Sequence, residues 1–467
     1  MSAPRRVIVI GAGPAGYVCA IRLAQLGQDV TVIEREALGG TCLNVGCIPS
    51  KAMIAAGSLM DRVSRASVMG ITVESLKLDL EQLVTWKGGI VERLTTGVGG
   101  LLEKNGAKVV MGEATLLGVD RVLVRGAEGE RTLEADDIVI ATGSVPTAIP
   151  GFEFDERHVW SSTGALSPDR LPEHLIVIGG GYIGLELGIM YRMLGSRVTV
   201  IEATEGALPG QDADCVKVIE RSLKKRKIKL LCGSFARGYE ESGGRLEVRI
   251  EGAGGENVLE CDQILSTVGR RPCSEGLGLE AAGLVTNEQG FVAVDERMHT
   301  GVANLYAIGD IAGQPMLAHK GSKEGLVAAG VIAGKAEVFD ARCIPAVIFT
   351  APEMASVGLT EEQCTERGIE FRCGRFPFSA SGRALSLMET EGFVKILADA
   401  KTDEVLGVHM VGPEVTELIA EATLAIEMGA TAEDIARTIH AHPTLPEAMM
   451  EAAESVHGMA VHIFERR

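Results

Sequence analysis

The chain has 467 residues, more than one hydrophobic core normally holds, so we expect two to four domains. Its formal net charge of −18 disfavours binding to nucleic acid, which requires a basic protein surface. The sequence contains no run of 18 apolar residues and no apolar signal region, so we expect a cytoplasmic protein without a membrane span.

The first elements have the pattern of a dinucleotide-binding unit. A strand at residues 6–10 leads into a turn that contains Gly11, Gly13 and Gly16. A helix at 17–26 follows, and a second strand at 29–33 ends at Glu34. The three glycines permit a tight turn, close approach of a phosphate and close helix packing, and the helix N-terminus offers free N–H groups to a pyrophosphate. Glu34 follows Gly11 by 23 residues and is placed to accept hydrogen bonds from a ribose. We predict a nucleotide site here rather than a purely structural turn.

Residues 39–51 contain two cysteines, Cys42 and Cys47, with Gly46 between them. On a regular helix this spacing would separate the Cα atoms by roughly 8–9 Å. A disulfide requires about 4.4–6.8 Å, so the pair can close only on a bent backbone, which Gly46 permits. A bridge over so short a loop adds little stability, and labile bridges of this kind are often catalytic. The spacing therefore points to redox chemistry.

Two other interpretations of this pair stay open on spacing alone. Two buried, inert thiols are one, because free cysteine is often a small core residue. A zinc site is the other, but it needs four ligands and the chain has no second close Cys or Cys/His pair. The ten cysteines of a chain that we expect to stay inside the cell should be mostly reduced, so an oxidised pair would be an exception made for function.

The dinucleotide pattern recurs later in the chain. A strand at residues 175–178 leads into a turn that contains Gly179, Gly181 and Gly184. A helix at 185–194 follows, and a second strand at 197–201 ends at Glu202. Glu202 again follows the first glycine by 23 residues, and a carboxylate there repels a 2′-phosphate, so NAD is favoured over NADP. Two complete patterns predict two dinucleotides with electrons passing between them.

Two further strands end in polar turns. Residues 138–142 lead into Gly143 and Ser144, and residues 305–308 lead into Gly309 and Asp310. A carboxylate at the end of a strand can hold a ribityl or ribose hydroxyl. An ordinary turn aspartate is the alternative for Asp310.

Residues 440–447 contain an acid–base pair. His442 has the residue type suited to proton transfer near neutral pH, and Glu447, five positions on, could fix its tautomer. Thiol exchange needs such a base because the thiolate is the nucleophile. A structural loop is the competing interpretation, and nothing in the sequence brings this segment to Cys42.

Taken together, these motifs resemble the flavoprotein pyridine nucleotide-disulfide oxidoreductases over essentially the whole chain, and within them the bacterial dihydrolipoamide dehydrogenases. The segments that carry the resemblance are GGTCLNVGCIPSK at 39–51, ATGS at 141–144, GGGYIGLELG at 179–188, GRRP at 269–272, IGD at 308–310, MLAHK at 316–320 and HAHPTLPE at 440–447. The resemblance implies an α/β fold with two Rossmann-like domains and a C-terminal α+β dimerisation domain. It divides the chain into an FAD-binding domain, an NAD-binding domain, a central segment that completes the FAD site and an interface domain: 1–148, 149–272, 273–342 and 343–467.

The same resemblance implies cofactor sites. FAD would bind at Gly11, Gly13, Gly16, Glu34, Thr41, Lys51, Ala141, Thr142, Gly143, Ser144, Asp310, Met316, Leu317, Ala318 and His319. NAD would bind at Gly179, Gly181, Tyr182, Gly184, Glu202 and Gly269. No metal is implied. Tyr182 replaces the small aliphatic residue of many relatives, and we hypothesise that it covers the nicotinamide face of the flavin until NAD arrives; a packed core tyrosine is the alternative.

The catalytic roles follow from the resemblance as well. Cys42 would be the thiol that meets the substrate and Cys47 the thiol beside the flavin. Lys51 would pair with Glu186 next to flavin N5. His442, oriented by Glu447, would be the base and would come from the other subunit of an obligatory homodimer. The partners implied are the lipoyl domain and core subunit of a 2-oxo acid dehydrogenase complex.

Two alternative functions remain. One is another flavoprotein disulfide reductase, of the glutathione or mercuric reductase kind; Glu202 disfavours an NADP-dependent enzyme, and the sequence printed ends at residues 465–467 without a cysteine pair, which disfavours mercuric reductase. The other is a scaffold subunit that binds a complex core through its acidic surface. The complete set of cysteines, lysine, histidine and glutamate makes pure scaffolding the weaker interpretation.

Overall fold

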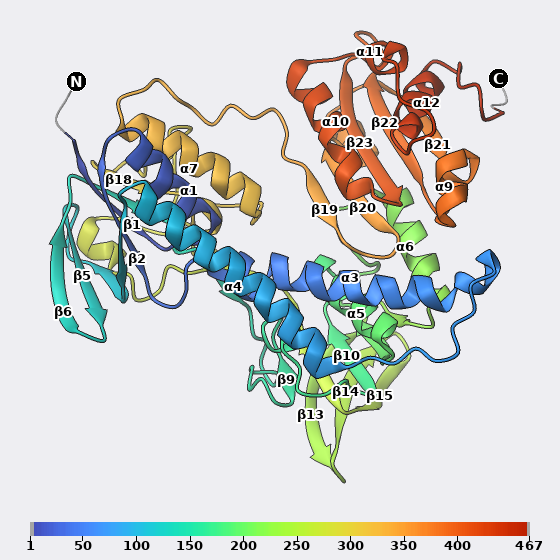
Figure 1. Cartoon of the computed structure of the whole chain (residues 1–467), viewed down its shortest axis with the longest axis horizontal. Coiled ribbons are helices and arrows are strands. Elements are labelled where there is room, and N and C mark those ends of the chain that lie inside the picture. The colour runs from blue at the N-terminus through green and yellow to red at the C-terminus, as the bar shows by residue number, and fades with distance from the viewer. Residues whose placement is uncertain (1–3, 465–467) are drawn as a thin grey trace.

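The computed structural model describes residues 4–464, so the expectation drawn from residues 465–467 lies outside the described part. Three groups of strands and helices are arranged around two long helices, with both described ends at the periphery (Figure 1). The predicted domain bounds at 148, 272 and 342 stay predictions, because the sheets alone do not set them.

The first nucleotide-binding unit is a five-stranded parallel sheet in the order β18-β7-β1-β2-β3. Its strands are β1 (Arg6–Ile10), β2 (Asp29–Glu34), β3 (Lys108–Met111), β7 (Asp137–Ile140) and β18 (Leu305–Ala307). Helices α1 (Pro14–Gln25) and α7 (Ala318–Ile332) pack together beside this sheet. β1 and β7 are almost wholly apolar and buried, as expected for strands of a parallel sheet covered on both faces. A three-stranded antiparallel sheet follows β3: β4 (Glu113–Leu116), β5 (Arg121–Gly126) and β6 (Gly129–Glu134).

The second unit repeats this plan with the sheet order β12-β11-β10-β16-β9. Its strands are β9 (Val159–Trp160), β10 (His174–Ile178), β11 (Arg197–Ile201), β12 (Lys229–Leu231) and β16 (Gln263–Ser266), and its helices are α5 (Tyr182–Leu194) and α6 (Ala213–Lys225). A three-stranded antiparallel sheet precedes β16 in the chain: β13 (Phe235–Ser242), β14 (Arg245–Gly252) and β15 (Gly255–Cys261). A small ladder links the units, formed by β8 (Ser144–Pro146) and β17 (Arg270–Pro272). The prediction of two Rossmann-like units is confirmed.

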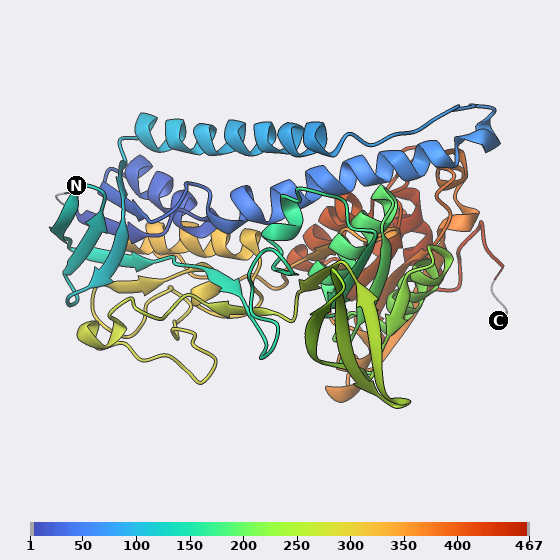
Figure 2. The same cartoon turned by 90° about the horizontal axis from the view of Figure 1, so that it is seen from below.

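Two long helices connect the units. α2 (Gly40–Val45) and α3 (Cys47–Ser64) form one bent helical stretch, and α3 packs on α5 and on α4 (Leu80–Lys104). Figure 2 shows α3 and α4 running along one side of the molecule. By length and composition the stretch Gly40–Ser64 could cross a membrane, but the same test is passed by core helices of soluble proteins. The bend at Gly46 and the packing of α3 against α5 give this stretch a role inside the fold.

The C-terminal region is an antiparallel sheet in the order β19-β20-β23-β22-β21 with helices packed on it. The strands are β19 (Ala346–Ile348), β20 (Glu353–Gly358), β21 (Phe371–Pro377), β22 (Phe393–Asp399) and β23 (Val405–Gly412), and the helices are α8 (Glu361–Glu366), α9 (Gly382–Leu387), α10 (Val415–Met428), α11 (Ala432–Arg437) and α12 (Glu447–Val456). Short 3₁₀ turns complete the chain: η1 (Ala66–Met69), η2 (Gly164–Leu166), η3 (Leu279–Ala282), η4 (Gly309–Ile311) and η5 (Phe378–Ala380). The expected α+β architecture of this region is confirmed.

The predicted starts of the two turn-following helices are wrong by three residues. α1 begins at Pro14 rather than Tyr17, and α5 begins at Tyr182 rather than Leu185. Proline fits the first helical position because the N–H it lacks has no partner there. Tyr182 is therefore the first residue of a helix and not part of the turn.

Candidate active site

A cavity of about 370 Å³ lies where the first glycine turn, the cysteine segment and the start of α5 meet. The predicted site residues that line it are Gly11, Gly13, Glu34, Thr41, Cys42, Cys47, Lys51, Ala141, Thr142, Gly143, Ser144, Tyr182, Glu186, Asp310, Met316, Leu317 and Ala318. They come from six separate stretches of the chain. The structure therefore brings together most of the residues that were assigned to the flavin and to the disulfide.

Other predicted residues do not line this cavity. They are Gly16, His319, Gly179, Gly181, Gly184, Glu202, Gly269, His442 and Glu447. The ring Nε2 of His319 lies 2.8 Å from the carbonyl oxygen of Pro345, and the assignment of His319 to the FAD site stays a prediction.

The first glycine turn has no room for side chains. Gly11 has a φ of +103°, and a Cβ there would lie 2.3 Å from the carbonyl oxygen of Ala141. A Cβ on Gly16 would lie 1.9 Å from the carbonyl oxygen of Gly11. Glu34 is buried and accepts hydrogen bonds from the N–H groups of Ala12 and Glu36, both at 2.8 Å. The acid thus fixes the turn, and its remaining lone pairs can still accept from a ribose.

The second turn reproduces this geometry. Gly179 has a φ of +105°, and a Cβ on Gly184 would lie 2.1 Å from the Gly179 carbonyl oxygen. Glu202 is buried and accepts from the N–H of Gly180 at 2.6 Å and from the N–H of Thr204 at 2.7 Å. Each acid therefore ties its strand end to its own turn.

The cysteine segment is bent as predicted. α2 ends at Val45, Gly46 has the non-helical dihedrals φ −139° and ψ −114°, and α3 begins at Cys47. A Cβ on Gly46 would lie 2.8 Å from the carbonyl oxygen of Thr41, so the bend requires glycine. The expectation that 42–47 is not a regular helix is confirmed.

Both cysteines are thiols in this structure and they interact directly. Their mutual hydrogen bond lowers the pKa of Cys47 to about 7 and raises the pKa of Cys42. Burial works against the Cys47 thiolate, whereas the nearby charge of Lys51 favours it. In the reduced state the negative charge therefore belongs on Cys47, whose side chain is open to the cavity.

Lys51 and Glu186 join three regions of the fold. Lys51 Nζ on α3 lies 2.8 Å from Glu186 Oε2 on α5, and it also lies 4.4 Å from the ring centroid of Phe349. The other carboxylate oxygen of Glu186 accepts from the N–H of Phe349 at 2.8 Å. Glu186 is buried, so this arrangement holds the ammonium of Lys51 beside Cys47 in a fixed position.

Asp310 lies in a hydrogen-bonded set that includes a residue missed by the sequence analysis. Its carboxylate accepts from the hydroxyl of Ser144 at 2.5 Å, and Arg270 donates to the Ser144 hydroxyl at 2.8 Å and to the Ser144 carbonyl at 2.7 Å. Arg270 lines the cavity, although only its neighbour Gly269 was assigned a role. Arg270 belongs to the GRRP motif, but sequence spacing does not identify its partner Ser144.

Tyr182 stands at the start of α5; the residue is 42% exposed and lines the cavity. Burial raises the pKa of its hydroxyl, and the Arg270 guanidinium lowers it in part. The side chain is therefore not packed into the core, which was the alternative to the lid hypothesis. The lid itself stays a prediction.

His442 and Glu447 form the expected pair. His442 Nδ1 lies 2.8 Å from Glu447 Oε1, and the N–H of Thr444 donates to Glu447 Oε2 at 2.8 Å. The pKa of Glu447 is lowered: burial opposes the shift, but the bonds from Thr444 and His442 outweigh it. The imidazole is 79% exposed and lies outside the cavity, so the structure does not bring it to Cys42 of the same chain.

The other thiols have a different character. Burial raises the pKa of Cys19 and of Cys261 to about 12, and of Cys343 and of Cys373 to about 11. It also raises the pKa values of Cys215, Cys232 and Cys364. Within residues 4–464 no cluster of His, Cys, Asp and Glu side chains could hold a metal ion.

Comparison with known proteins agrees with this architecture. Residues 5–325 match the family model described as pyridine nucleotide-disulphide oxidoreductase, and residues 344–453 match its dimerisation domain. The chain is 48% identical to the dihydrolipoyl dehydrogenase of Thermus scotoductus, with 98% of this chain and 99% of that protein covered. It is 47% identical to that of Bacillus subtilis, with 98% and 97% covered.

Solved structures are similar in fold over nearly the whole chain, at lower sequence identity. The crystal structure of LpdA from Mycobacterium tuberculosis is similar at a TM-score of 0.91 and 30% identity, with 96% of this chain and 99% of that chain covered. The HOCl-induced flavoprotein disulfide reductase RclA from Escherichia coli is similar at a TM-score of 0.87 and 27% identity, with 96% and 99% covered.

Proposed function

Because the chain belongs to the pyridine nucleotide-disulphide oxidoreductase family, we propose that it is a dihydrolipoyl dehydrogenase, which reoxidises protein-bound dihydrolipoamide with NAD⁺. One observation carries the proposal beyond the similarity. Two cysteine thiols on a bent backbone, one of them with a lowered pKa, line a cavity that they share with the first glycine turn and with the first turn of α5 in the second unit.

The cavity fits FAD. Gly11, Gly13 and Gly16 leave the backbone open to a pyrophosphate at the start of α1, and Glu34 is placed for a ribose. Ser144 and Asp310 offer polar atoms further along the cavity, and Lys51 and Cys47 lie there too. Bound FAD would supply the two-electron chemistry between the dithiol and NAD⁺. NAD would be held at the second turn, where the charge of Glu202 favours a 2′-hydroxyl over a 2′-phosphate.

The cysteines exchange electrons with the substrate. In the oxidised enzyme a substrate thiolate attacks the Sγ atom of Cys42, a substrate–Cys42 disulfide forms, and the Cys42–Cys47 bond breaks with its electron pair left on Cys47. The second substrate thiol, once deprotonated, then attacks the substrate sulfur of the mixed disulfide. Oxidised lipoamide leaves, and Cys42 carries the released sulfur as a thiol or thiolate. The low pKa of Cys47 keeps the other electron pair on the sulfur beside Lys51.

The base for these steps would be His442 of a second copy of the chain. The pair His442–Glu447 is built and exposed but lies away from the cavity of its own subunit. The C-terminal region matches a dimerisation domain, which supports a homodimer. Glu447 would hold Nδ1 so that Nε2 is free to accept the proton of a substrate thiol.

The partners would be a lipoyl domain, which carries the substrate, and the core subunit of a 2-oxo acid dehydrogenase complex. The names of the relatives support this placement for the chain without identifying the complex.

The proposal is tested by rapid mixing of the FAD-loaded enzyme with dihydrolipoamide. We expect a long-wavelength absorption band from the Cys47 thiolate beside the flavin, followed by its loss on addition of NAD⁺. Absence of the band, or faster reduction by NADPH than by NADH, would contradict the proposed function.

A further inference from the structure

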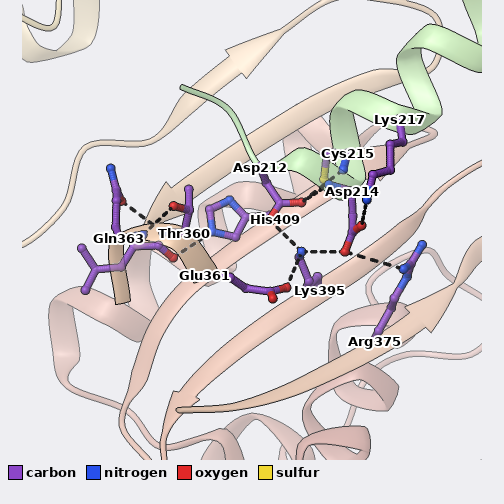
Figure 3. A network of polar contacts seen from close by, with 11 residues as sticks. Asp212, Asp214, Cys215, Lys217, Thr360, Glu361, Gln363, Arg375, Lys395 and His409 are labelled. Atoms are coloured by element: carbon purple, nitrogen blue, oxygen red, sulfur yellow. Dashed lines mark hydrogen bonds and ion pairs between the residues drawn. The ribbon is translucent and has the colours of Figure 1, made fainter. Parts of the chain in front are cut away.

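A buried lysine outside the active site joins the C-terminal region to the second nucleotide-binding unit. Lys395 on β22 is only 2% exposed, and its Nζ atom is surrounded by three carboxylates (Figure 3). It lies 2.7 Å from Asp212, 3.1 Å from Asp214 and 2.7 Å from Glu361. An ammonium has three N–H donors, so each can be directed at one of the three acids.

The acids differ in where they come from. Glu361 begins α8 and belongs to the same region as Lys395, whereas Asp212 and Asp214 stand at the start of α6 in the second unit. Asp214 and Glu361 are partly exposed, and Asp212 is buried like the lysine. The contact between Lys395 and Asp212 is therefore the buried ion pair of the cluster, and it crosses between the two regions.

The two oxygens of Asp212 have separate tasks. Oδ1 caps α6 by accepting from the N–H groups of Asp214 and Cys215, each at 3.1 Å. Oδ2 contacts Lys395. The carboxylate that sets where α6 begins is thus oriented by a residue from another region of the fold.

The loop that ends at Asp212 starts at the nucleotide acid Glu202. Within it, Leu208 donates its N–H to the carbonyl oxygen of Gly180 at 3.0 Å, and Glu202 accepts from the N–H of Gly180. Leu208 is buried and has a φ of +51°, a left-handed conformation that a leucine keeps only when its surroundings fix it. The loop therefore contacts the glycine turn at Gly180 and is fixed at its far end by Asp212.

We propose that Lys395 is a positioning residue for the second dinucleotide site: by fixing Asp212 it holds the 202–212 loop against Gly180 in the conformation that accepts the nucleotide. This inference rests on the proposed binding of NAD at the second turn. It adds that affinity at this site depends on a side chain of the C-terminal region that does not touch the ligand.

The test measures binding of ADP-ribose, which occupies a nucleotide site without exchanging electrons, to the FAD-loaded protein by equilibrium dialysis. We expect Lys395→Met to weaken ADP-ribose binding by about fivefold, the size typical of changes that act through intervening contacts. The rate of flavin reduction by dihydrolipoamide should stay unchanged, and the KM for NAD⁺ should rise more than kcat falls.

Two further variants keep the test decisive. Lys395→Met combined with Asp212→Asn leaves no buried unpaired carboxylate and keeps a residue that caps a helix, so it should fold even if the single variant does not. It should bind ADP-ribose as weakly as the single variant. Glu361 contacts the same lysine but not the loop, so Glu361→Gln should weaken ADP-ribose binding by less than about twofold.

The proposal is overturned if the double variant binds ADP-ribose as the parent does, or if Glu361→Gln weakens binding equally. A parallel loss of flavin reduction by dihydrolipoamide would show a general structural role and would also overturn it. Failure of the parent enzyme to react with dihydrolipoamide would instead contradict the proposed function and leave the ADP-ribose comparison interpretable.

Discussion

The two nucleotide-binding units share the order of four parallel strands (β7-β1-β2-β3 and β16-β10-β11-β12), the glycine geometry and the acid, yet they continue differently after that acid. After Glu34 the chain enters the bent segment that carries Cys42 and Cys47. After Glu202 it forms the loop that returns to Gly180 and ends at Asp212, the N-cap of α6. The segment after Glu34, the first continuation, places two cysteines at the cavity. The segment after Glu202, the second continuation, connects its unit to the C-terminal region.

This difference shows that binding of a dinucleotide and the role of the bound dinucleotide depend on different segments of each unit. The shared parts, turn, helix start and acid, provide a place for a dinucleotide. What the dinucleotide can do depends on the segment that follows. We expect substitutions in the shared parts to act on one nucleotide each, and substitutions in the continuations to act on chemistry in the first unit and on positioning in the second.

The largest effect should come from the cysteines of the first continuation. Cys42→Ser or Cys47→Ser should lower turnover with dihydrolipoamide by about four orders of magnitude, as is typical when a nucleophile is removed. Reduction of ferricyanide by NADH should persist, because that reaction needs only the flavin and the second site. Both rates are measured on FAD-loaded protein, with the exposed Cys373→Ser as control. Equal loss of both reactions would contradict the view that the segment after Glu34 serves the thiol chemistry alone.

Substitution of the glycine that packs the helix in each unit should affect binding of FAD and of NAD⁺ separately. Gly16→Ala and Gly184→Ala each place a Cβ about 2 Å from a carbonyl oxygen, an overlap expected to cost about 3 kcal/mol locally. Gly16→Ala should lose FAD during purification, whereas Gly184→Ala should keep FAD and lose NAD⁺ binding. Flavin absorbance and equilibrium dialysis measure these outcomes. Gly97→Ala, where a Cβ meets nothing within 4 Å, is the matched control.

The acids offer a milder version of the same comparison. Glu34→Gln and Glu202→Gln each lose a charged acceptor of two backbone N–H groups, which should weaken binding of the corresponding dinucleotide by about tenfold. Glu202→Gln should also discriminate less against NADP⁺, because the charge that repels a 2′-phosphate is gone. A change in FAD retention in the Glu202 variant would count against independent sites.

The smallest expected effect concerns proton affinity. In the reduced enzyme the pKa of Cys47 is lowered to about 7, so the thiolate is present above that pH and is protonated below it. Lys51→Met removes a positive charge that favours the thiolate, and the midpoint should move up by about one pH unit. The long-wavelength band of the reduced enzyme, titrated against pH, gives the midpoint, and the exposed Lys401→Met provides the control. An unmoved or lower midpoint would contradict the assignment of Lys51.

The local parts of this structure could be predicted from the sequence because their causes are local. Three glycines, a helix and an acid at fixed spacing determine a turn, and the Cys42–Cys47 spacing excludes a regular helix unless the backbone bends at Gly46. The helix starts were misplaced because the sequence pattern does not show that the residue after the middle glycine is already helical.

The remaining features depend on contacts that sequence spacing does not encode. The ring of His319 lies within hydrogen-bond distance of the carbonyl oxygen of Pro345, 26 positions on. Arg270 reaches Ser144 from 126 positions away, and Lys395 reaches Asp214 across 181. A buried lysine in a strand carries no motif, so only the fold reveals its partners.

The distribution of thiol acidity described above has a consequence for chemical damage. Eight of the ten cysteines have raised pKa values and Cys47 alone has a lowered one: Cys19, Cys42, Cys215, Cys232, Cys261, Cys343, Cys364 and Cys373 against Cys47. Electrophiles and peroxides react with thiolates, so at neutral pH the reduced protein directs such reagents to Cys47 in preference to the eight cysteines with raised pKa values. Those eight sulfur atoms stay protonated, and mild alkylation should therefore inactivate the protein at Cys47 before it alters the fold.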